Sequence, residues 1–366
     1  MTVAAFMDLA LYDPRFGYYA RAAQRSGRAG DFFTSVDVGP VFGQLLEIQI
    51  AEMAAILGSE FSIHQIDIVE AAAGNGRLSA DIVRAARRSH PALYEHLRLH
   101  LVEASAGARA DQRRALGEVA DRLVSSAERL PAGFDGVLLA NELLDALPTH
   151  QVIMREDGLR EVYVDAAPDD SGTLVVREGA LSTPRLADYL RDCGVALEPG
   201  WRVEINLRAV DWIRDAARRL RRGFVILVDY GHEARELYSA SHAGGTLTTF
   251  SGHSMEGPES PPHRPPWLQR PGDQDITAHV DFTSVRAAGE AEGLTTIGFL
   301  DQTYFLMGLL GANPLNLLNS LNLSERLALK TLLMPGGLGS THKVLIFGKG
   351  VGTPSLSGCS YRIRVT

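Results

Sequence analysis

Three short stretches of the sequence carry side chains that could bind a ligand or take up a proton. In the first, Glu70 precedes a turn with Gly74 and Gly76, where the backbone can bend sharply and offer N–H groups to an anion. In the second, Glu103 stands about 25–30 residues further on, where a carboxylate can accept both hydroxyls of a ribose. In the third, Glu142 offers a carboxylate to a cationic group. Together they predict a site for a nucleoside cofactor and a cationic nucleophile.

The turn distinguishes two classes of nucleoside cofactor. A dinucleotide site would read Gly-x-Gly-x-x-Gly, but Ser79 stands where the third glycine belongs. Glu70 would repel a pyrophosphate and attract an ammonium group, which favours S-adenosylmethionine. The turn is similar to the acid-x-Gly-x-Gly-x-Gly turn of class I methyltransferases, except that Ala72 replaces the first glycine. An ordinary strand-to-helix turn without a ligand stays open as the alternative.

Buried strands are expected to hold these residues at one edge of a parallel sheet. Apolar residues at 66–69 and 97–102 predict two strands that end in acidic residues, and residues 136–140 predict a third strand. The apolar stripe within 78–83 predicts a helix after the turn. Ligands of open α/β sheets bind at the carboxyl ends of the strands, so we expect the three stretches to converge there.

The third stretch places an amide and two carboxylates at the end of a strand. These are Asn141, Glu142 and Asp145. We expect Asp145 to follow Glu142 by one helical step, so that both carboxylates could grip one cationic group. Capping of a short helix by Asn141 and Asp145 is an equally simple interpretation.

A polar turn precedes the first strand of the sheet. It contains Gly30, Asp31, Thr34 and Ser35, and an apolar helix follows at 41–53. Two interpretations stay open: the turn caps that helix, or it is a flexible turn that enters the cofactor site.

The rest of the chain predicts an insertion and the remaining core elements. Asp157-Gly158 between apolar segments is a hairpin signal, and a helix is expected at 184–193. Further elements are predicted from their apolar patterns: a short strand at 120–124, an amphipathic helix at 202–220, a strand at 223–228, a helix at 281–292, and strands at 294–298 and 343–347.

Composition narrows the class of protein. Acidic residues outnumber basic ones by 44 to 36 and no long basic run occurs, which argues against nucleic acid as a partner. No apolar run approaches the ~20 residues that span a bilayer, and the N-terminus lacks the regions of a signal peptide. We therefore expect no membrane partner and a cytoplasmic location. The two cysteines form no disulfide framework.

Histidines and aspartates are frequent in the later part of the chain, which raises the question of a metal. His242 and His279 are among them. Their spacing is irregular, and neither a paired-ligand helix nor a companion cysteine occurs, so we expect no metal site. We interpret residues 232–281 as a long loop on the substrate side of the core.

Several ordered motifs resemble the MidA/NDUFAF7-type class I methyltransferases over most of the chain. The motifs are LYDP (11–14), GYY (17–19), GDFFTS (30–35), FGQLL (42–46), ANELLDALP (140–148), DYGH (229–232), GTL (245–247), DIT (275–277) and HVDF (279–282). The mitochondrial member of this family is a protein arginine methyltransferase for a subunit of respiratory complex I. The chain is identified as a bacterial member.

The resemblance implies a Rossmann-like α/β fold with a mostly parallel seven-stranded sheet and an antiparallel last strand. It implies a helical lead-in at 1–60, a methyltransferase core at 61–150 and 195–350, and a hairpin and helix insertion at 151–194. Ala72 departs from the family pattern. If this residue has a positive φ, it strains the turn by ~1 kcal/mol or more and could weaken cofactor binding.

The resemblance also implies S-adenosylmethionine as the cofactor and arginine in a protein as the methyl acceptor. The implied cofactor-binding residues are Gly30, Asp31, Thr34, Ser35, Glu70, Ala72, Gly74, Gly76, Glu103 and Asn141. Asn141, Glu142 and Asp145 are the implied catalytic residues. Two alternatives remain: a methyltransferase for a small molecule, and an assembly or scaffold protein with weak catalysis. The candidate partners are accordingly a protein substrate, a small molecule, or a second copy of the chain in a homodimer.

Overall fold

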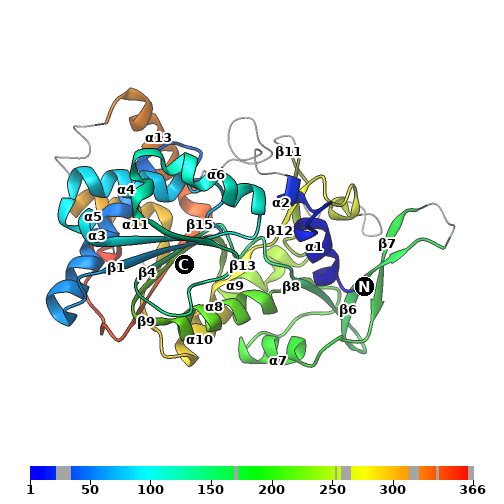
Figure 1. Ribbon diagram of the computed structural model, residues 1–366. Coiled ribbons are helices and arrows are strands. Elements are labelled where there is room, and N and C mark those ends of the chain that lie inside the picture. The colour runs from blue at the N-terminus through cyan, green and yellow to red at the C-terminus, as the bar shows by residue number, and fades with distance from the viewer. Residues whose placement is uncertain are drawn as a thin grey trace. The chain divides into compact units, whose positions relative to one another are not determined.

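The computed structural model describes residues 1–21, 34–168, 172–251, 254–256, 265–312, 321–334 and 338–361. The chain forms two compact units, each assembled from three stretches of sequence. Unit 1 comprises Met1–Phe32, Leu144–Ile213 and Gly231–Ala288, and unit 2 comprises Phe33–Leu143, Arg214–Tyr230 and Gly289–Thr366. Figure 1 labels many of the elements of both units.

Unit 2 is built on seven strands of an eight-stranded sheet, in the order β3-β2-β1-β4-β9-β15-β14, and the eighth strand, β13 (Val280–Asp281), pairs with the end of β9. Its strands are β1 (Ile66–Ala71), β2 (Leu97–Val102), β3 (Leu123–Ala127), β4 (Phe134–Asn141), β9 (Leu220–His232), β14 (Thr295–Asp301) and β15 (His342–Lys349). Strand β15 is antiparallel to both of its neighbours, and the pairs from β3 to β9 are parallel. This confirms the predicted mostly parallel sheet with an antiparallel last strand.

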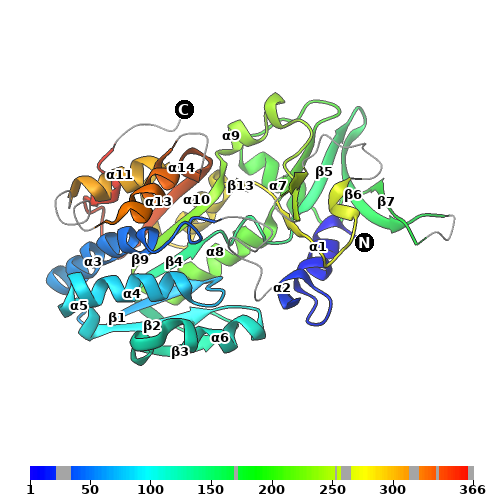
Figure 2. The same ribbon diagram turned by 90° about the horizontal axis from the view of Figure 1, so that it is seen from above.

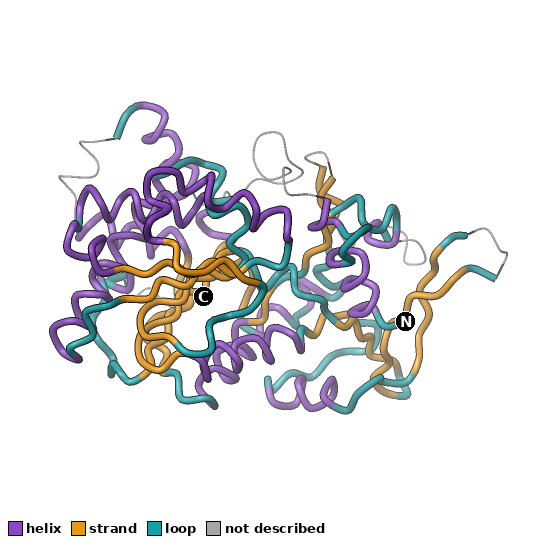
Figure 3. The backbone as a smooth tube through the Cα atoms, viewed as in Figure 1, coloured by secondary structure: helices purple, strands orange, loops and turns teal. Residues whose placement is uncertain are grey.

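Helices cover the sheet of unit 2 (Figures 2 and 3). They are α3 (Val41–Phe61), α4 (Arg77–Ser89), α5 (Pro91–His96), α6 (Ala106–Leu116), α11 (Gln302–Ala312), α13 (Leu323–Leu333) and α14 (Leu338–Thr341), with 3-10 turns η1 (Gly117–Arg122) and η4 (Ser357–Cys359). Every residue of β1 is buried, as expected for a parallel strand covered on both faces. Helix α3 packs against α4, α11 and α13.

Helix α3 is long and apolar enough to cross a membrane by length and composition alone, and this was not expected from the sequence. In the structure it is a core helix. More than half (56%) of its most apolar window is buried, and it carries buried Glu47 and Gln49. Glu47 pairs with His90 at 2.6 Å, and Gln49 accepts a hydrogen bond from the Gly358 N–H at 3.0 Å. These two buried polar side chains therefore have partners within unit 2.

Unit 1 contains two small sheets of antiparallel strands. The four-stranded sheet has the order β7-β6-β5-β8, and the three-stranded sheet has the order β11-β10-β12. The strands are β5 (His150–Arg155), β6 (Gly158–Ala166), β7 (Leu174–Gly179), β8 (Arg202–Ile205), β10 (Thr248–Ser251), β11 (Ser254–Glu256) and β12 (Asp275–Thr277). Strands β5 and β6 pair up to Arg155 and Gly158, which confirms the predicted hairpin.

Short helices complete unit 1. They are α1 (Val3–Tyr12), α2 (Tyr18–Arg21), α7 (Arg185–Asp192), α9 (Ala234–Leu237), η2 (Ala240–His242) and η3 (Pro266–Leu268). Helices α8 (Leu207–Arg219) and α10 (Phe282–Ala291) begin in this unit. Its apolar core includes Phe6, Leu11, Val162 and Trp267. Helix α1, predicted as part of a lead-in to the core, thus packs with the strands of unit 1.

Three predicted elements differ from the structure. Residues 202–220 were expected to form one helix, but β8 precedes α8 because Val203 and Ile205 alternate with polar residues and pair with β5. Strand β3 starts later than predicted because η1 occupies 117–122. In place of a single loop, residues 232–281 contain short helices and strands.

Candidate active site

The turn between β1 and α4 changes direction through three left-handed residues. Ala72 has φ +56°, Gly74 has φ +51° and Gly76 has φ +84°. A Cβ atom at Gly76 would lie 3.1 Å from Leu101 Cδ1, whereas at Gly74 no described atom would lie within 4 Å. The turn therefore has a packed side at Gly76 and open space beside Gly74, where a ligand can approach the main chain. Because Ala72 has a positive φ, its backbone is strained, as expected for an alanine that replaces a glycine in this turn.

Two side chains hold both backbone polar groups of Gly74. Glu103, just beyond β2, accepts the Gly74 N–H at 2.9 Å through Oε2 and the Ser105 N–H at 2.7 Å through Oε1. Gln112 donates to the Gly74 carbonyl at 2.9 Å and accepts from Ser126 Oγ at 2.6 Å. The carboxylate predicted to bind a ribose thus lies directly beside the turn.

Sequence reasoning missed Gln112. It is fully buried in α6, four residues from Ala108 and four from Leu116, which are also buried. A polar residue on the apolar stripe of a helix is the signal that could have found it.

Glu70 is buried at the end of β1 and accepts hydrogen bonds from the backbone N–H and hydroxyl of Ser79, in the first turn of α4. Burial, together with the charges of Glu103 and Asp81, raises the pKa of Glu70 to about 8 despite these hydrogen bonds. At pH 7 the carboxyl group is therefore mainly protonated. The repulsion of a pyrophosphate that the sequence suggested is weaker than expected, and a cofactor contact by Glu70 stays a prediction.

Asn141 and Glu142 stand at the carboxyl end of β4. Glu142 has φ +51°, a left-handed conformation rare for a residue with a side chain, and its N–H donates to the Val228 carbonyl at 2.8 Å. Its Oε1 accepts from the Ser35 N–H and from Asn141 Nδ2, both at 3.3 Å, and lies 3.5 Å from His342 Nε2. The carboxylate is therefore fixed in one orientation.

A buried acceptor adjoins this carboxylate. Asn141 Oδ1 is buried and has no hydrogen-bond partner among the described residues. A buried carbonyl oxygen without a donor costs about 1–3 kcal/mol, so such an atom marks a place for a ligand N–H or O–H. The end of β4 thus offers a ligand an unused hydrogen-bond acceptor as well as a carboxylate.

The predicted helical step from Glu142 to Asp145 is wrong. Residues 142–145 form bends and a turn, because the left-handed φ of Glu142 cannot continue a right-handed helix. Asp145 belongs to unit 1, where it is buried and its carbonyl accepts the Ala278 N–H at 3.0 Å. The joint action of Glu142 and Asp145 on one ligand stays a prediction.

The polar turn before α3 is tied to α4 by hydrogen bonds. Both the N–H and the hydroxyl of Thr34 donate to Asp37 at 3.0 Å, and Asp37 pairs with Arg77 at 2.5 Å. Ser35 is fully buried and donates to Gln302 Oε1 at 3.2 Å. Two further predicted residues of this turn lie outside the described residues: Gly30 and Asp31.

The strand order with antiparallel β15 and the glycine turn after β1 define a Rossmann-like class I methyltransferase. Residues 45–300 match the family described as "Putative S-adenosyl-L-methionine-dependent methyltransferase", and the chain belongs to this family. The chain is thus a methyltransferase, and S-adenosylmethionine is its cofactor. The open space beside Gly74, the adjacent Glu103 carboxylate and the unpartnered Asn141 oxygen fit a ligand with hydroxyl and ammonium donors.

Solved structures and relatives agree with this family. A crystal structure of a Burkholderia thailandensis protein bound to S-adenosyl-homocysteine is 28% identical, has a TM-score of 0.86, and the match covers 98% of this chain and 90% of that one. The mouse "Protein arginine methyltransferase NDUFAF7, mitochondrial" is 29% identical over 84% of this chain and 70% of its own length. The Drosophila melanogaster homologue is 27% identical over 95% and 82%, respectively.

Proposed function

We propose that this methyltransferase transfers the methyl group of S-adenosylmethionine to an arginine side chain of a protein. One observation carries the proposal: the Glu142 carboxylate is held at the end of β4 by hydrogen bonds from two donors to a single oxygen, Oε1. Among the described residues, none forms a hydrogen bond or ion pair with Oε2. That oxygen is the one we assign to the guanidinium of the substrate.

Arginine needs such a carboxylate. Its guanidinium is charged at neutral pH, with a pKa above ~12, and its charge is delocalised, so it is a poor nucleophile. A fixed carboxylate localises the positive charge away from the attacking nitrogen and accepts the proton that is lost after transfer. The bound cofactor supplies an electrophilic methyl group. The contribution of Glu142 is then to orient the acceptor nitrogen, which a carboxylate fixed in one orientation does without further loss of freedom.

The names of two relatives and the net charge of the chain support arginine in a protein as the methyl acceptor. The mouse and fly proteins that match most of this chain are both named protein arginine methyltransferases. The acidic net charge of −8 also suits a cationic protein substrate better than an anionic one.

Glu142→Gln tests the proposal, because glutamine keeps the size of the side chain and removes the charge and the proton acceptor. Purified enzyme and isotope-labelled S-adenosylmethionine are added to a lysate from cells that lack the gene, and methylated arginine is identified by mass spectrometry of the proteins. We expect the wild type to label arginine and Glu142→Gln to lose at least about 100-fold in rate, as for loss of a general base. Calorimetry should show cofactor affinity unchanged.

Glu60→Gln is the matched control, because Glu60 is an exposed residue near the end of α3. It should retain the full rate. Label in small molecules with none in protein would refute the arginine proposal and favour the small-molecule alternative. Undiminished arginine labelling by Glu142→Gln would remove Glu142 from the mechanism.

A further inference from the structure

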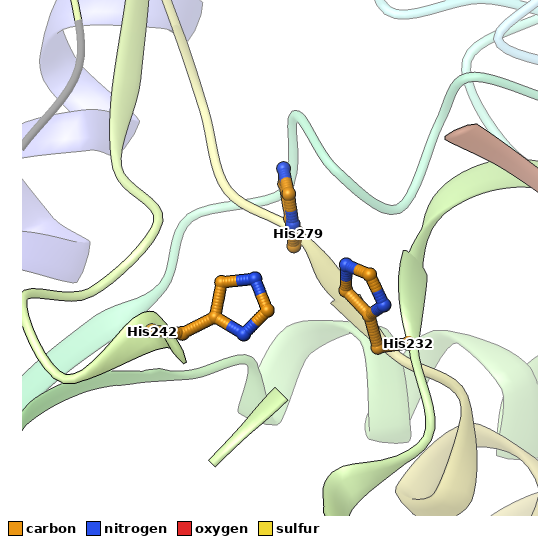
Figure 4. A group of neighbouring side chains, drawn as sticks. All are labelled: His232, His242 and His279. Atoms are coloured by element: carbon orange, nitrogen blue, oxygen red, sulfur yellow. The ribbon is translucent and has the colours of Figure 1, made fainter. Parts of the chain in front are cut away.

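Three histidines that are far apart in the sequence meet in unit 1. His232 ends β9, His242 ends η2, and His279 precedes the short strand β13 (Val280–Asp281). One ring nitrogen of each lies within 4.8 Å of the corresponding nitrogens of the other two. Figure 4 shows the three imidazoles facing one another from three separate segments. We call this group the histidine cluster.

Backbone pairing holds the histidine cluster together. Strand β13 pairs in parallel with the end of β9, with Asp281 opposite His232, and this brings His279 beside the end of β9. The His279 N–H donates to Thr246 Oγ1 at 3.1 Å, and the carbonyl of His242 accepts the Gly245 N–H at 2.9 Å. The rings are therefore gathered by the fold of unit 1, with ring centroids 4.9 to 6.0 Å apart.

The spacing is close to that of a metal site. Three atoms no more than 4.8 Å apart have a common point about 2.8 Å or less from each, since 4.8/√3 is about 2.8. Zinc is bound by histidine nitrogens at about 2.0–2.1 Å. Each nitrogen would have to move by less than about 1 Å, which a rotation of the imidazole about its side-chain torsions provides.

Oxygen atoms of Glu236 lie close to ring nitrogens of both His242 and His232. The carbonyl of Glu236 lies 3.1 Å from His242 Nδ1, and because a carbonyl can only accept, His242 donates its Nδ1–H there. The Nε2 atom of neutral His242 then carries the lone pair that a metal requires. The carboxylate of Glu236 lies 3.0 Å from His232 Nδ1. Contacts of this kind, to a carboxylate or backbone carbonyl, are the usual outer support of metal-binding histidines.

We propose that His232, His242 and His279 bind one divalent transition-metal ion, with zinc as the ion that suits three imidazoles and a fourth position for water. The ion cross-links the end of β9, η2 and the chain before β13, and so stabilises this part of unit 1. The irregular spacing of the histidines along the chain had predicted no metal site. Spacing along the chain does not report their distance once β13 pairs with β9.

The test uses the full chain without a histidine tag, stripped with a chelator. Zinc is titrated in competition with a chromophoric chelator, and Co²⁺ is added in parallel as a spectroscopic probe. We expect one zinc ion per chain, visible Co²⁺ absorption bands typical of a four-coordinate site, and a higher Tm with zinc. His242→Ala should weaken zinc binding at least about 100-fold and abolish the bands, because even outer partners of metal sites are worth 10–100-fold.

His64→Ala is the matched control, since His64 is exposed in unit 2, and it should bind zinc as the wild type does. Circular dichroism of the metal-free proteins checks that His242→Ala folds. His242→Gln, which keeps more of the side chain, replaces it if it does not. Absence of binding at micromolar zinc would overturn the proposal, and so would wild-type affinity in the folded His242 variant.

Discussion

Replacing Ala72 by glycine should stabilise unit 2 by relieving the backbone of the turn after β1. Ala72 has φ +56°, a conformation that costs an L-residue about 1–2 kcal/mol. Glycine has no Cβ and adopts this conformation without strain. Glycine also adds about 0.4–1 kcal/mol of conformational freedom to the unfolded chain, which opposes the gain. We expect a net increase of about 0.5–1 kcal/mol in the free energy of unfolding.

Equilibrium unfolding in urea, followed by far-UV circular dichroism, measures this change. Tryptophan fluorescence would be the wrong probe, because all three tryptophans, Trp201, Trp212 and Trp267, belong to unit 1. Separate transitions of the two units would be fitted separately, since a single two-state fit holds only for a cooperative unit.

Two control substitutions should lower the free energy of unfolding, whereas Ala72→Gly should raise it. Gly74→Ala adds a Cβ that meets no described atom within 4 Å, so its cost of about 1 kcal/mol is backbone strain alone. Ala110→Gly, at an exposed position of α6, should destabilise by about 1 kcal/mol through lost helix propensity. If Ala72→Gly destabilised unit 2 as much as Ala110→Gly does, the strain argument would be refuted.

Three further substitutions probe the same turn. Glu70→Gln should become more stable relative to the wild type as the pH rises from about 5 to 8. The carboxyl group of Glu70 ionises near pH 4.5 in the unfolded chain but only near pH 8 in the folded protein. Between these values the free energy of unfolding of the wild type therefore falls by roughly 1.4 kcal/mol per pH unit, and that of the variant does not. Glu103→Ala should weaken S-adenosylmethionine binding by ~1–3 kcal/mol in calorimetry, as for loss of charged hydrogen bonds. Gly76→Ala should destabilise unit 2 by about 1–2 kcal/mol in urea, because φ is +84° and the added Cβ would crowd Leu101.

Each of these has a result that contradicts it. Parallel pH profiles for wild type and Glu70→Gln would show that Glu70 is ionised in the folded protein at pH 7. Cofactor affinity that is equal in Glu103→Ala and in the exposed control Glu95→Ala would remove the ribose assignment. A stability of Gly76→Ala equal to that of the wild type would show that the turn accepts a side chain there.

Local apolar patterns were enough to predict the elements that carry the turn. Strands β1, β2 and β4 each contain a short apolar run. Of the polar residues predicted to follow these runs, Glu103 lies just beyond β2, whereas Glu70 and Asn141 still lie within the last two residues of β1 and β4. Gly74 and Gly76 both have positive φ, as expected of glycines in a sharp turn. These features depend on residues close together in the sequence, so the sequence reveals them.

Features that depend on packing could not be predicted in the same way. The protonation of Glu70 follows from burial, and the conformation of Glu142 follows from a hydrogen bond to Val228 in a neighbouring strand. The hydrogen bond from Gln112 to the Gly74 carbonyl joins helix α6 to the turn after β1. The histidine cluster requires the pairing of β13 with β9. In each case the partner is set by the tertiary fold, so inspection of the local sequence misses it.

The position of β15 in the sequence determines when the sheet of unit 2 can be completed during synthesis. This strand, at His342–Lys349, is inserted between β9 and β14, both of which precede it in the sequence. While the ribosome is still synthesising the chain, β9 and β14 each have an unpaired edge, and neither can be completed until β15 emerges. Nascent or truncated chains that lack β15 therefore leave β14 without any strand partner and one edge of β9 exposed, and chaperones that bind such edges would act latest on this part of the sheet.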